Sequence, residues 1–356
     1  MAESNIVSEN IASKNIEPAT ITAILEKLYA NQVLTLEESE TLFTAVVLGE
    51  MDPIVLSSVL TALKIRGEQP DEIAGAAQAL LAAALPFPAV ESRHADCCGT
   101  GGDNMNTINI STTAAFVAAA CGLKMTKHGN RSVSSKSGSS DLLEAFGINL
   151  TQTPEQAKAC LDELGICFLF APQYHAGIRH AIPVRQALKT RTIFNVLGPL
   201  LNPTRPQVQL MGVYDECLIR PIAETMDKLG VQRALVVHGS GLDEIALHGE
   251  TKVAELNNGM ITEFTISPAD FGVERYDVAE LRGGDAAENK VIIERLLSGN
   301  GTDAQKAAVA INVSALLVVA EIATDFKHGT ELAMAAIDDG RALALILQLA
   351  VKSQQV

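Results

Sequence analysis

The sequence predicts an α/β protein with two parts: a small all-helical N-terminal domain, and a large domain with a mainly parallel central sheet, one antiparallel strand and flanking helices. Residues 18–88 carry helix signals only, whereas from about residue 92 short apolar runs alternate with capped helices. Such alternation is typical of parallel strands joined by crossover helices. The 356 residues favour two domains or one large α/β unit, and with 47% hydrophobic and 19% charged residues they are enough for a sizeable core.

The helical region is predicted from the residues that begin each helix. Polar caps and first-turn prolines favour helix starts. The four start signals are Pro18, the Thr35–Glu38 capping box, Asp52-Pro53 and Pro70-Asp71. About four helices are therefore expected before Pro86 and Pro88 break the pattern.

The alternating region contains one complete helix-to-strand unit. A Thr153–Gln156 capping box begins a helix, Gly165 ends it, and residues 166–170 follow as an apolar strand. The same pattern predicts strands at 96–98, 209–213 and 234–237, and a helix at 216–229.

A β-hairpin supplies the antiparallel strand. Residues 253–256 and 261–266 are strand-like and are separated by Asn257-Asn258-Gly259, a sequence that favours a tight turn. Beyond residue 285 the chain is expected to be mostly helix.

These elements predict the domain organisation. Residues 1–17 are expected to be a flexible extension, and residues 18–88 the helical domain, which the helical segment 174–200 is expected to join. Residues 89–173 and 201–356 form the expected large α/β domain.

Charge and cysteine usage limit the functional class. A net charge of −15 argues against a nucleic-acid-binding surface, because such binding needs a basic face. The six cysteines lack metal-binding or redox spacing, which predicts free thiols in a reducing compartment. Residues 1–17 do not resemble a signal peptide, and the apolar stretch 307–320 is too short and polar to span a membrane. A core helix and a cytoplasmic location are expected.

A glycine-rich loop follows the strand expected at 96–98. Gly99-Thr100-Gly101-Gly102-Asp103 precedes a helix expected near Ser111. Glycines let backbone N–H groups approach an anion, and a helix N-terminus adds partial positive charge. The loop therefore predicts a phosphate or diphosphate site; the alternative is a tight turn that needs left-handed backbone.

The segment Asn109-Ile110-Ser111-Thr112 lies at the start of that helix. Ser111 or Thr112 is expected to cap the helix. A hydroxyl at this position can also hold a phosphate oxygen or a metal-bound water.

A second candidate loop runs from Lys127 to Asp141, ahead of another helix. Its three cations, Lys127, Arg131 and Lys136, lie among hydroxyls and glycines and offer charge-assisted donors to a polyphosphate. A solvated serine-rich loop is the alternative. The concentration of cations in an acidic chain favours the phosphate site.

Adjacent carboxylates follow the strand expected at 234–237. Asp243 and Glu244 at the end of a strand suit Mg²⁺, which prefers a few carboxylates together with water and substrate phosphates. An ordinary surface turn is the alternative, and the metal interpretation gains support from the two anion loops.

The segment 174–200 contains one candidate for binding a carboxylate. The guanidinium of Arg185 can present paired donors to two oxygens. A surface charge for Arg185, and structural roles for His175 and His180, are the simpler interpretations of these residues alone.

Four signatures in this order and spacing resemble the anthranilate phosphoribosyltransferase family. They are GTGGD at 99–103, NIST at 109–112, KHGNRSVSSKSGSSDLLE at 127–144 and RTIFNVLGPLLNP at 191–203. The resemblance implies a Mg²⁺-dependent pentosyltransferase of tryptophan biosynthesis, which transfers the 5-phosphoribosyl group of phosphoribosyl pyrophosphate to the amine of anthranilate and releases pyrophosphate. It also implies a homodimer formed through the helical domain.

The resemblance further implies roles for individual residues. Those implied for phosphoribosyl pyrophosphate are Gly99, Thr100, Gly101, Gly102, Asp103, Thr107, Asn109, Ser111, Thr112, Lys127 and Ser139. Those implied for anthranilate are Gly99, His128, Asn130, His175 and Arg185. Those implied for Mg²⁺ are Ser111, Asp243 and Glu244. Lys127, His128 and Arg185 are expected to act by electrostatics and positioning, with no residue acting as an acid or base.

The chain departs from the family pattern at two places. Asn104 stands where many members have glycine, and His175 is followed by Ala176-Gly177-Ile178 where members have Pro-Ala-Met.

An arylamine is already a competent nucleophile, so catalysis is expected to come from aligning the substrates and stabilising the departing charge. Two alternatives remain. A pyrimidine nucleoside phosphorylase shares the architecture but needs a nucleobase pocket in place of Asn130 and Arg185. A non-catalytic, nucleic-acid-binding homologue should have a basic face and broken loops.

Overall fold

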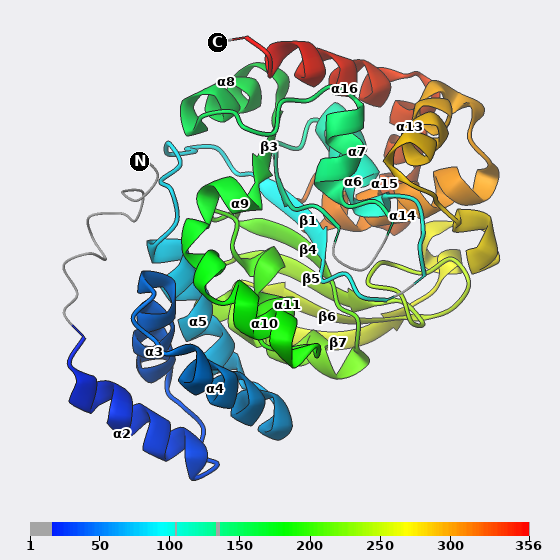
Figure 1. The fold of residues 1–356 in the computed structure, drawn as a ribbon. Helices are drawn as coiled ribbons and strands as arrows, with labels where there is room; N and C mark the ends of the chain where they lie inside the picture. The colour runs from blue at the N-terminus through cyan, green and yellow to red at the C-terminus, as the bar shows by residue number, and fades with distance from the viewer. Residues whose placement is uncertain (1–15, 104, 133–135, 356) are drawn as a thin grey trace.

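The computed structural model describes residues 16–103, 105–132 and 136–355, which form helices around a seven-stranded sheet (Figure 1). The predicted α/β class is confirmed. Most of the expected extension at 1–17 lies outside the described residues, as do Asn104 and the Ser134-Ser135 pair of the second loop.

Residues 18–82 fold into four helices, as predicted. These are α2 Pro18–Tyr29, α3 Leu36–Leu48, α4 Pro53–Arg66 and α5 Pro70–Ala82. The capping box is confirmed: the Thr35 hydroxyl accepts from the Glu38 N–H at 3.2 Å, and the Glu38 carboxylate accepts from the Thr35 N–H at 2.7 Å. Asp52 caps α4 by accepting from the Ile54 N–H at 2.8 Å.

The sheet has the strand order β3-β2-β1-β4-β5-β6-β7. Its strands are β1 Ala95–Gly99, β2 Met125–Gly129, β3 Ile166–Phe170, β4 Val208–Gly212, β5 Arg233–His238, β6 Thr251–Asn257 and β7 Met260–Ile266. Strands β1 to β5 are parallel, and β6 is antiparallel to both neighbours. Asn258 and Gly259 have φ angles of 49° and 87°, so the predicted tight turn joins β6 to β7.

Helices cover both faces of the sheet. The longer ones are α6 Ile110–Ala120, α7 Ser139–Ala145, α8 Pro154–Leu164, α12 Ile219–Lys228, α13 Ala286–Arg295, α14 Asp303–Val319, α15 Phe326–Asp338 and α16 Arg341–Lys352. Short helices α9 Ala171–Tyr174, α10 Ile182–Leu188 and α11 Phe194–Leu197 follow β3. The predicted unit of α8, Gly165 and β3 is confirmed. The helix predicted at 216–229 is a 3₁₀ turn, Glu216–Leu218, followed by α12.

The alternation of side chains along the strands separates two hydrophobic cores. Leu235 and Val237 belong to the core that contains α6, α14, α15 and α16, whereas Ala234 and Val236 belong to the core that contains α12. The second core continues into α2–α5 and α10, which lie beside the sheet (Figure 1). The N-terminal helices therefore pack on the same apolar layer that covers one face of the sheet.

Two further sequence expectations are tested by the fold. Residues 307–319 lie in α14, which is mostly buried, so the prediction of a core helix is confirmed. All six cysteines are free. In the described ranges no single helix has the length and apolar character to cross a membrane, although the bent pair 286–300 and 303–319 passes by length and composition together.

Asn312 in the middle of α14 should be important for stability. Its buried amide donates to the Ala308 carbonyl at 2.9 Å and accepts from the Ile245 N–H at 3.1 Å. Asn312→Leu would leave that N–H buried without a partner, so we expect a loss of about 1–3 kcal/mol in unfolding free energy. Urea unfolding measures this, with Gln32→Leu as an exposed control; equal stabilities would contradict the role of Asn312.

Candidate active site

The predicted site residues gather at the carboxyl ends of the parallel strands. The glycine-rich loop leaves β1, the second loop leaves β2, and the segment with Asp243 and Glu244 follows β5. Because β1 lies between β2 and β4, successive connections diverge at this edge, where α/β proteins form ligand-binding crevices.

Asp243 packs against the glycines that end β1 and β4. Its carboxylate accepts a hydrogen bond from the Gly101 N–H at 2.6 Å. A Cβ atom on Gly99 would collide with this carboxylate, and one on Gly212 would collide with the Asp243 backbone. Glycine is therefore required at both strand ends for the Asp243 segment to cross them.

Glu244 is bound by the first turn of α6. The backbone N–H of Ser111 donates to its carboxylate at 3.1 Å, and the Ser111 hydroxyl makes a short hydrogen bond to the same oxygen. The N-cap of α6 is Asn109, so the prediction that Ser111 or Thr112 caps the helix was wrong. First-turn N–H groups have no partner within a helix, and Glu244 supplies one for Ser111.

The two carboxyl groups are costly to ionise together. Burial and the neighbouring Asp103 raise the pKa of Asp243, and burial and Asp243 raise the pKa of Glu244. In the described part of the chain, no three His, Cys, Asp or Glu side chains are arranged as a complete ligand set for a metal ion. Any cation bound here would need oxygens from water or substrate.

Further hydrogen bonds and one β-bridge hold Thr100, Asp103 and the residues that follow the glycine-rich loop. The Thr100 N–H donates to the Gly212 carbonyl at 2.9 Å, and the Thr100 hydroxyl accepts from the Tyr214 N–H at 3.0 Å. Asp103 accepts from the Met105 N–H at 3.1 Å, and Thr107 pairs with Arg282 in an isolated bridge. Gly101 and Gly102 have φ angles of 68° and 84°, which other residues rarely adopt.

Lys127 on β2 is a buried cation whose charge interacts with Glu244. Only 2% of its surface is exposed, and its ammonium donates to the His128 carbonyl at 3.0 Å. Burial alone would lower the pKa of Lys127, but the Cys98 sulfur and the carboxylates of Asp96 and Glu244 raise it. The site therefore contains a buried positive charge on β2.

His128 and His175 form a buried pair with ring centroids 5.4 Å apart. Burial, His175 and Lys127 hold the pKa of His128 well below its usual value, and burial lowers the pKa of His175 to about 4. His175 Nε2 contacts the Leu201 carbonyl at 2.7 Å. His128 Nε2 is buried and has no hydrogen-bond partner among the described residues. Both rings are thus neutral near pH 7.

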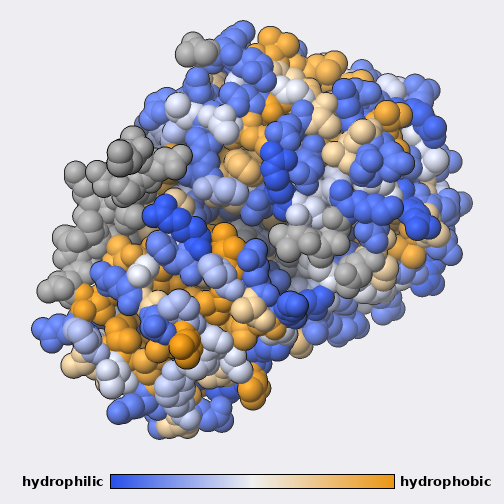
Figure 2. All heavy atoms as spheres, viewed as in Figure 1, coloured by the Kyte–Doolittle hydropathy of each residue, from blue (hydrophilic) through white to orange (hydrophobic). Residues whose placement is uncertain are grey.

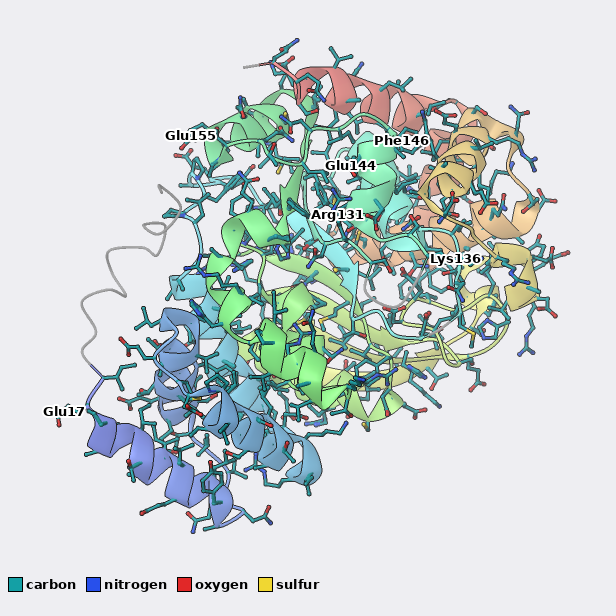
Figure 3. The ribbon with its side chains drawn as sticks, viewed as in Figure 1. Glu17, Arg131, Lys136, Glu144, Phe146 and Glu155 are labelled. Atoms are coloured by element: carbon teal, nitrogen blue, oxygen red, sulfur yellow. The ribbon has the colours of Figure 1, made fainter. Side chains whose placement is uncertain are left out.

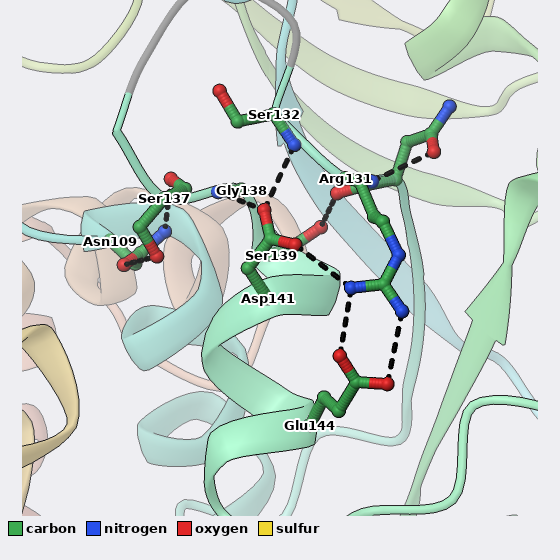
Figure 4. Close-up of polar contacts among 9 residues, drawn as sticks. Asn109, Arg131, Ser132, Ser137, Gly138, Ser139, Asp141 and Glu144 are labelled. Atoms are coloured by element: carbon green, nitrogen blue, oxygen red, sulfur yellow. Dashed lines mark hydrogen bonds and ion pairs between the residues drawn. The ribbon is translucent and has the colours of Figure 1, made fainter. Parts of the chain in front are cut away.

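The second loop is tied to the end of β2 and to α6. The Ser139 hydroxyl donates to the Asn130 carbonyl at 3.2 Å, and only a glycine at 129 leaves room for it. The Asn109 amide donates to the Ser137 carbonyl at 3.1 Å (Figure 4). The Asn109 side chain at the start of α6 therefore contacts the second loop two residues before α7 begins.

Arg131 does not have the phosphate-binding role that the cation-rich composition of the second loop suggested. It pairs with Asp141 at 3.0 Å and Glu144 at 2.8 Å, and Figure 3 shows Arg131 and Glu144 directed toward each other. The expectation that all three cations of this loop face a polyphosphate is wrong for Arg131, since these carboxylates balance its charge. Lys136 is exposed.

Arg185 is half-buried, with its guanidinium 5.2 Å from the centre of the Phe194 ring. Among the described residues it makes no hydrogen bond or ion pair with another side chain, and burial lowers its pKa. A guanidinium in this state has donors available for an anionic ligand.

Arg191 has a contact with the glycine-rich loop that was not predicted from the sequence. Its guanidinium donates to the Gly102 carbonyl and lies 3.9 Å from the centre of the Tyr214 ring. The Arg191 carbonyl accepts from the Lys64 ammonium of α4 at 3.0 Å. Arg191 thus joins the glycine-rich loop to the N-terminal helices.

Family models match both parts of the chain. Residues 91–343 match the a/b domain of the glycosyl transferase family, and residues 22–84 match its helical bundle domain. The fold and the site thus define a glycosyl transferase built from a helical bundle and an α/β domain.

Individual relatives define the family more narrowly. The anthranilate phosphoribosyltransferases of Photobacterium profundum and Psychromonas ingrahamii are each 63% identical over 334 residues, 94% of this chain and 98% of each relative. The crystal structure of the Thermus thermophilus enzyme has a TM-score of 0.89 at 38% identity, over 93% of this chain and 99% of that one. The chain belongs to the anthranilate phosphoribosyltransferase family.

A structure of the Saccharomyces cerevisiae member in complex with phosphoribosyl pyrophosphate and Mg has a TM-score of 0.87 at 27% identity. It covers 96% of this chain and 99% of the yeast chain.

The raised pKa values of Asp243 and Glu244 predict a pH dependence of stability. Without a cation, the folded protein binds protons on these groups more tightly than the unfolded chain does. The contribution of these two groups to stability is therefore fully present below the ordinary carboxyl range near pH 4 and is lost as pH rises through the raised values. The double variant Asp243→Asn, Glu244→Gln should be more stable than the parent by at least about 1 kcal/mol at pH 8 in a chelating buffer.

Urea unfolding at pH 5 and pH 8 measures this difference, with the exposed Glu37→Gln as control. A parent and double variant with the same pH dependence would show that the two carboxyl groups titrate normally.

Proposed function

We propose that this chain transfers the phosphoribosyl group of phosphoribosyl pyrophosphate to the amine of anthranilate and releases pyrophosphate, as its family membership indicates. The observation that carries the assignment to this site is the convergence of Gly101 and Ser111 on Asp243 and Glu244, with Lys127 adjacent. These residues come from loops that are distant in the sequence, yet they are joined by hydrogen bonds and by the interaction of their charges.

The diphosphate and ribose phosphate are assigned to the glycine-rich loop, the start of α6 and the second loop. Gly101 and Gly102 hold the loop in a left-handed conformation, the Gly101 N–H donates to Asp243, and Lys127 adds a buried charge. The proposed contacts are Gly99, Thr100, Gly101, Gly102, Asp103, Thr107, Asn109, Ser111, Thr112, Lys127 and Ser139.

The oxygens of Ser111, Asp243 and Glu244 fit Mg²⁺. They are hard ligands, and burying two carboxyl groups together disfavours their ionisation unless a cation is near. When bound, Mg²⁺ would neutralise the charge of the leaving pyrophosphate. Because the protein lacks a complete ligand set among its described residues, the remaining ligands are assigned to substrate oxygens and water.

Anthranilate is assigned to Arg185 on α10 and to the end of β2. The unpaired guanidinium of Arg185 suits its carboxylate, and the unpartnered Nε2 of His128 can meet a polar substrate group. Gly99, Asn130 and His175 complete the proposed contacts. His175, which bonds to the Leu201 carbonyl, also holds the His128 ring in place.

Positioning and electrostatics account for the proposed catalysis. The amine attacks the anomeric carbon of ribose as the bond to pyrophosphate breaks, and the bond electrons leave with pyrophosphate. Lys127 and the backbone N–H groups stabilise this departing charge, while Arg185 orients the amine. Neutral histidines at neutral pH leave the amine's proton to pass to solvent or to the leaving group.

We further propose that a homodimer forms through the helical part of the chain, taken as residues 18–88 with 174–200, against an α/β part of 89–173 and 201–356. Exposed apolar side chains support the dimer: Ile54 and Ile65 on α4 are each 81% exposed, and apolar residues gather on this part in Figure 2. The free cysteines support the reducing cytoplasm as the proposed location.

Loss of anthranilate fluorescence on addition of phosphoribosyl pyrophosphate and Mg²⁺ tests the reaction. The variant Asp243→Asn, Glu244→Gln should lower kcat by at least about 100-fold, because the departing charge loses its cation. Chelation of the parent should abolish activity, and added Mg²⁺ should restore it.

Near-normal turnover in a folded double variant would contradict the metal assignment. Release of thymine from thymidine and phosphate by the parent, without consumption of anthranilate, would instead favour a pyrimidine nucleoside phosphorylase.

The dimer is tested by Ile54→Lys, Ile65→Lys. Eleven residues apart, the two side chains lie on the same face of α4. Light scattering after size exclusion should give a dimer mass for the parent and a monomer mass for the variant, whereas Met260→Lys on β7 should remain dimeric. A monomeric parent would overturn the proposed interface.

A further inference from the structure

The start of α7 contains a carboxylate that joins two segments of the second loop. Asp141 Oδ2 accepts from the Ser132 N–H at 3.0 Å and from the Gly138 N–H at 2.9 Å (Figure 4). One oxygen therefore holds backbone groups that are six residues apart in the sequence.

The two segments are in direct contact at this point. A Cβ atom on Gly138 would collide with the Ser132 nitrogen, so only glycine fits there. The Asn130 carbonyl accepts from the Ser140 N–H and from the Ser139 hydroxyl, each at 3.2 Å. The position of the Ser139 hydroxyl thus depends on how the segments containing Asn130 and Gly138 meet.

The second oxygen of Asp141 is also used. Oδ1 accepts from Arg131 Nη1 at 3.0 Å, and the same guanidinium binds both oxygens of Glu144 at 2.8 and 2.9 Å. Burial raises the pKa of Asp141, but the N–H groups of Ser132 and Gly138 and the guanidinium of Arg131 lower it overall. The carboxylate is therefore ionised.

A carboxylate near the start of α7 would repel an anionic ligand unless its charge were balanced. Two backbone N–H groups and one guanidinium balance it here, so Arg131 is committed to Asp141 and Glu144 and is not available to a diphosphate. The Asp141–Arg131 ion pair therefore acts on the geometry of the loop and does not bind the ligand directly.

We propose that Asp141 is a positioning residue for phosphoribosyl transfer: it fixes the segments of Asn130 and Gly138 against each other and so sets the Ser139 hydroxyl for the phosphoribosyl donor. This inference rests on the proposed function, which assigns Ser139 to that substrate. Asp141 itself does not contact the substrate. The Ser137 carbonyl, bound by Asn109, extends the same support to the start of α6.

The decisive variant is Asp141→Asn, which keeps the shape of the side chain. An amide has one acceptor oxygen, so it cannot accept from the two N–H groups and also from Arg131. We expect the KM for phosphoribosyl pyrophosphate to rise about 10-fold, as for loss of a charge-assisted hydrogen bond. The KM for anthranilate should rise by a smaller factor, because only Asn130 among its proposed contacts lies on a segment that Asp141 holds, whereas Arg185 and His175 are held by other elements.

Asp325→Asn is the matched control. Asp325 caps α15 by accepting from the His328 N–H at 2.9 Å and has no bond to the described residues of the second loop, 127–132 and 136–141. Both variants should lose similar stability, but only Asp141→Asn should change the KM for phosphoribosyl pyrophosphate. A selective rise in that KM supports positioning, whereas an unchanged KM in a folded Asp141→Asn protein overturns it.

Arg131→Gln keeps the test informative if Asp141→Asn folds poorly. This variant removes the partner of Oδ1 and leaves the bonds from Ser132 and Gly138 in place. It should raise the same KM by a smaller factor, and an unchanged KM would count against the proposal. If the parent shows no phosphoribosyl transfer, the proposed function fails; if the parent is active and both variants keep the parental KM, only the role of Asp141 fails.

Discussion

The contact of Asp243 with Gly99 and Gly212 is the constraint on which the site depends. The segment after β5 must cross the ends of β1 and β4 to bring Glu244 to Ser111, and a side chain on either glycine would block that path. In this position the Asp243 carboxylate accepts from the Gly101 N–H, and the Glu244 carboxylate accepts from the first turn of α6. Gly99, at the start of the glycine-rich loop, and Gly212, at the end of β4, therefore both make room for the acidic segment.

Local patterns predicted most of the fold. The Thr35 and Asp52 caps, the Gly165 stop and the Asn258-Gly259 turn are each decided by neighbours within four residues, so the sequence displays them directly. The four family signatures likewise identified the loops at the strand ends. The division of the interior into two cores was not predicted, because it depends on which face of the sheet each helix covers.

The errors arose where distant partners decide a residue's role. Ser111 looked like a cap because the sequence does not show Glu244, 133 residues away, competing for its donors. Arg131 looked like a phosphate ligand because its pairing with Asp141 requires the turn into α7. Arg191 contacts Gly102 across 89 residues, and nothing near it in the sequence indicates this.

The core shared by α2–α5, α12 and one face of the sheet has a consequence for how the molecule folds. If the N-terminal helices were separated from the remainder, the apolar sides of α5 and α12 would both meet water. Neither piece could then keep its full hydrophobic stabilisation. The N-terminal helices and the sheet thus belong to a single cooperative folding unit and are not independently folding domains.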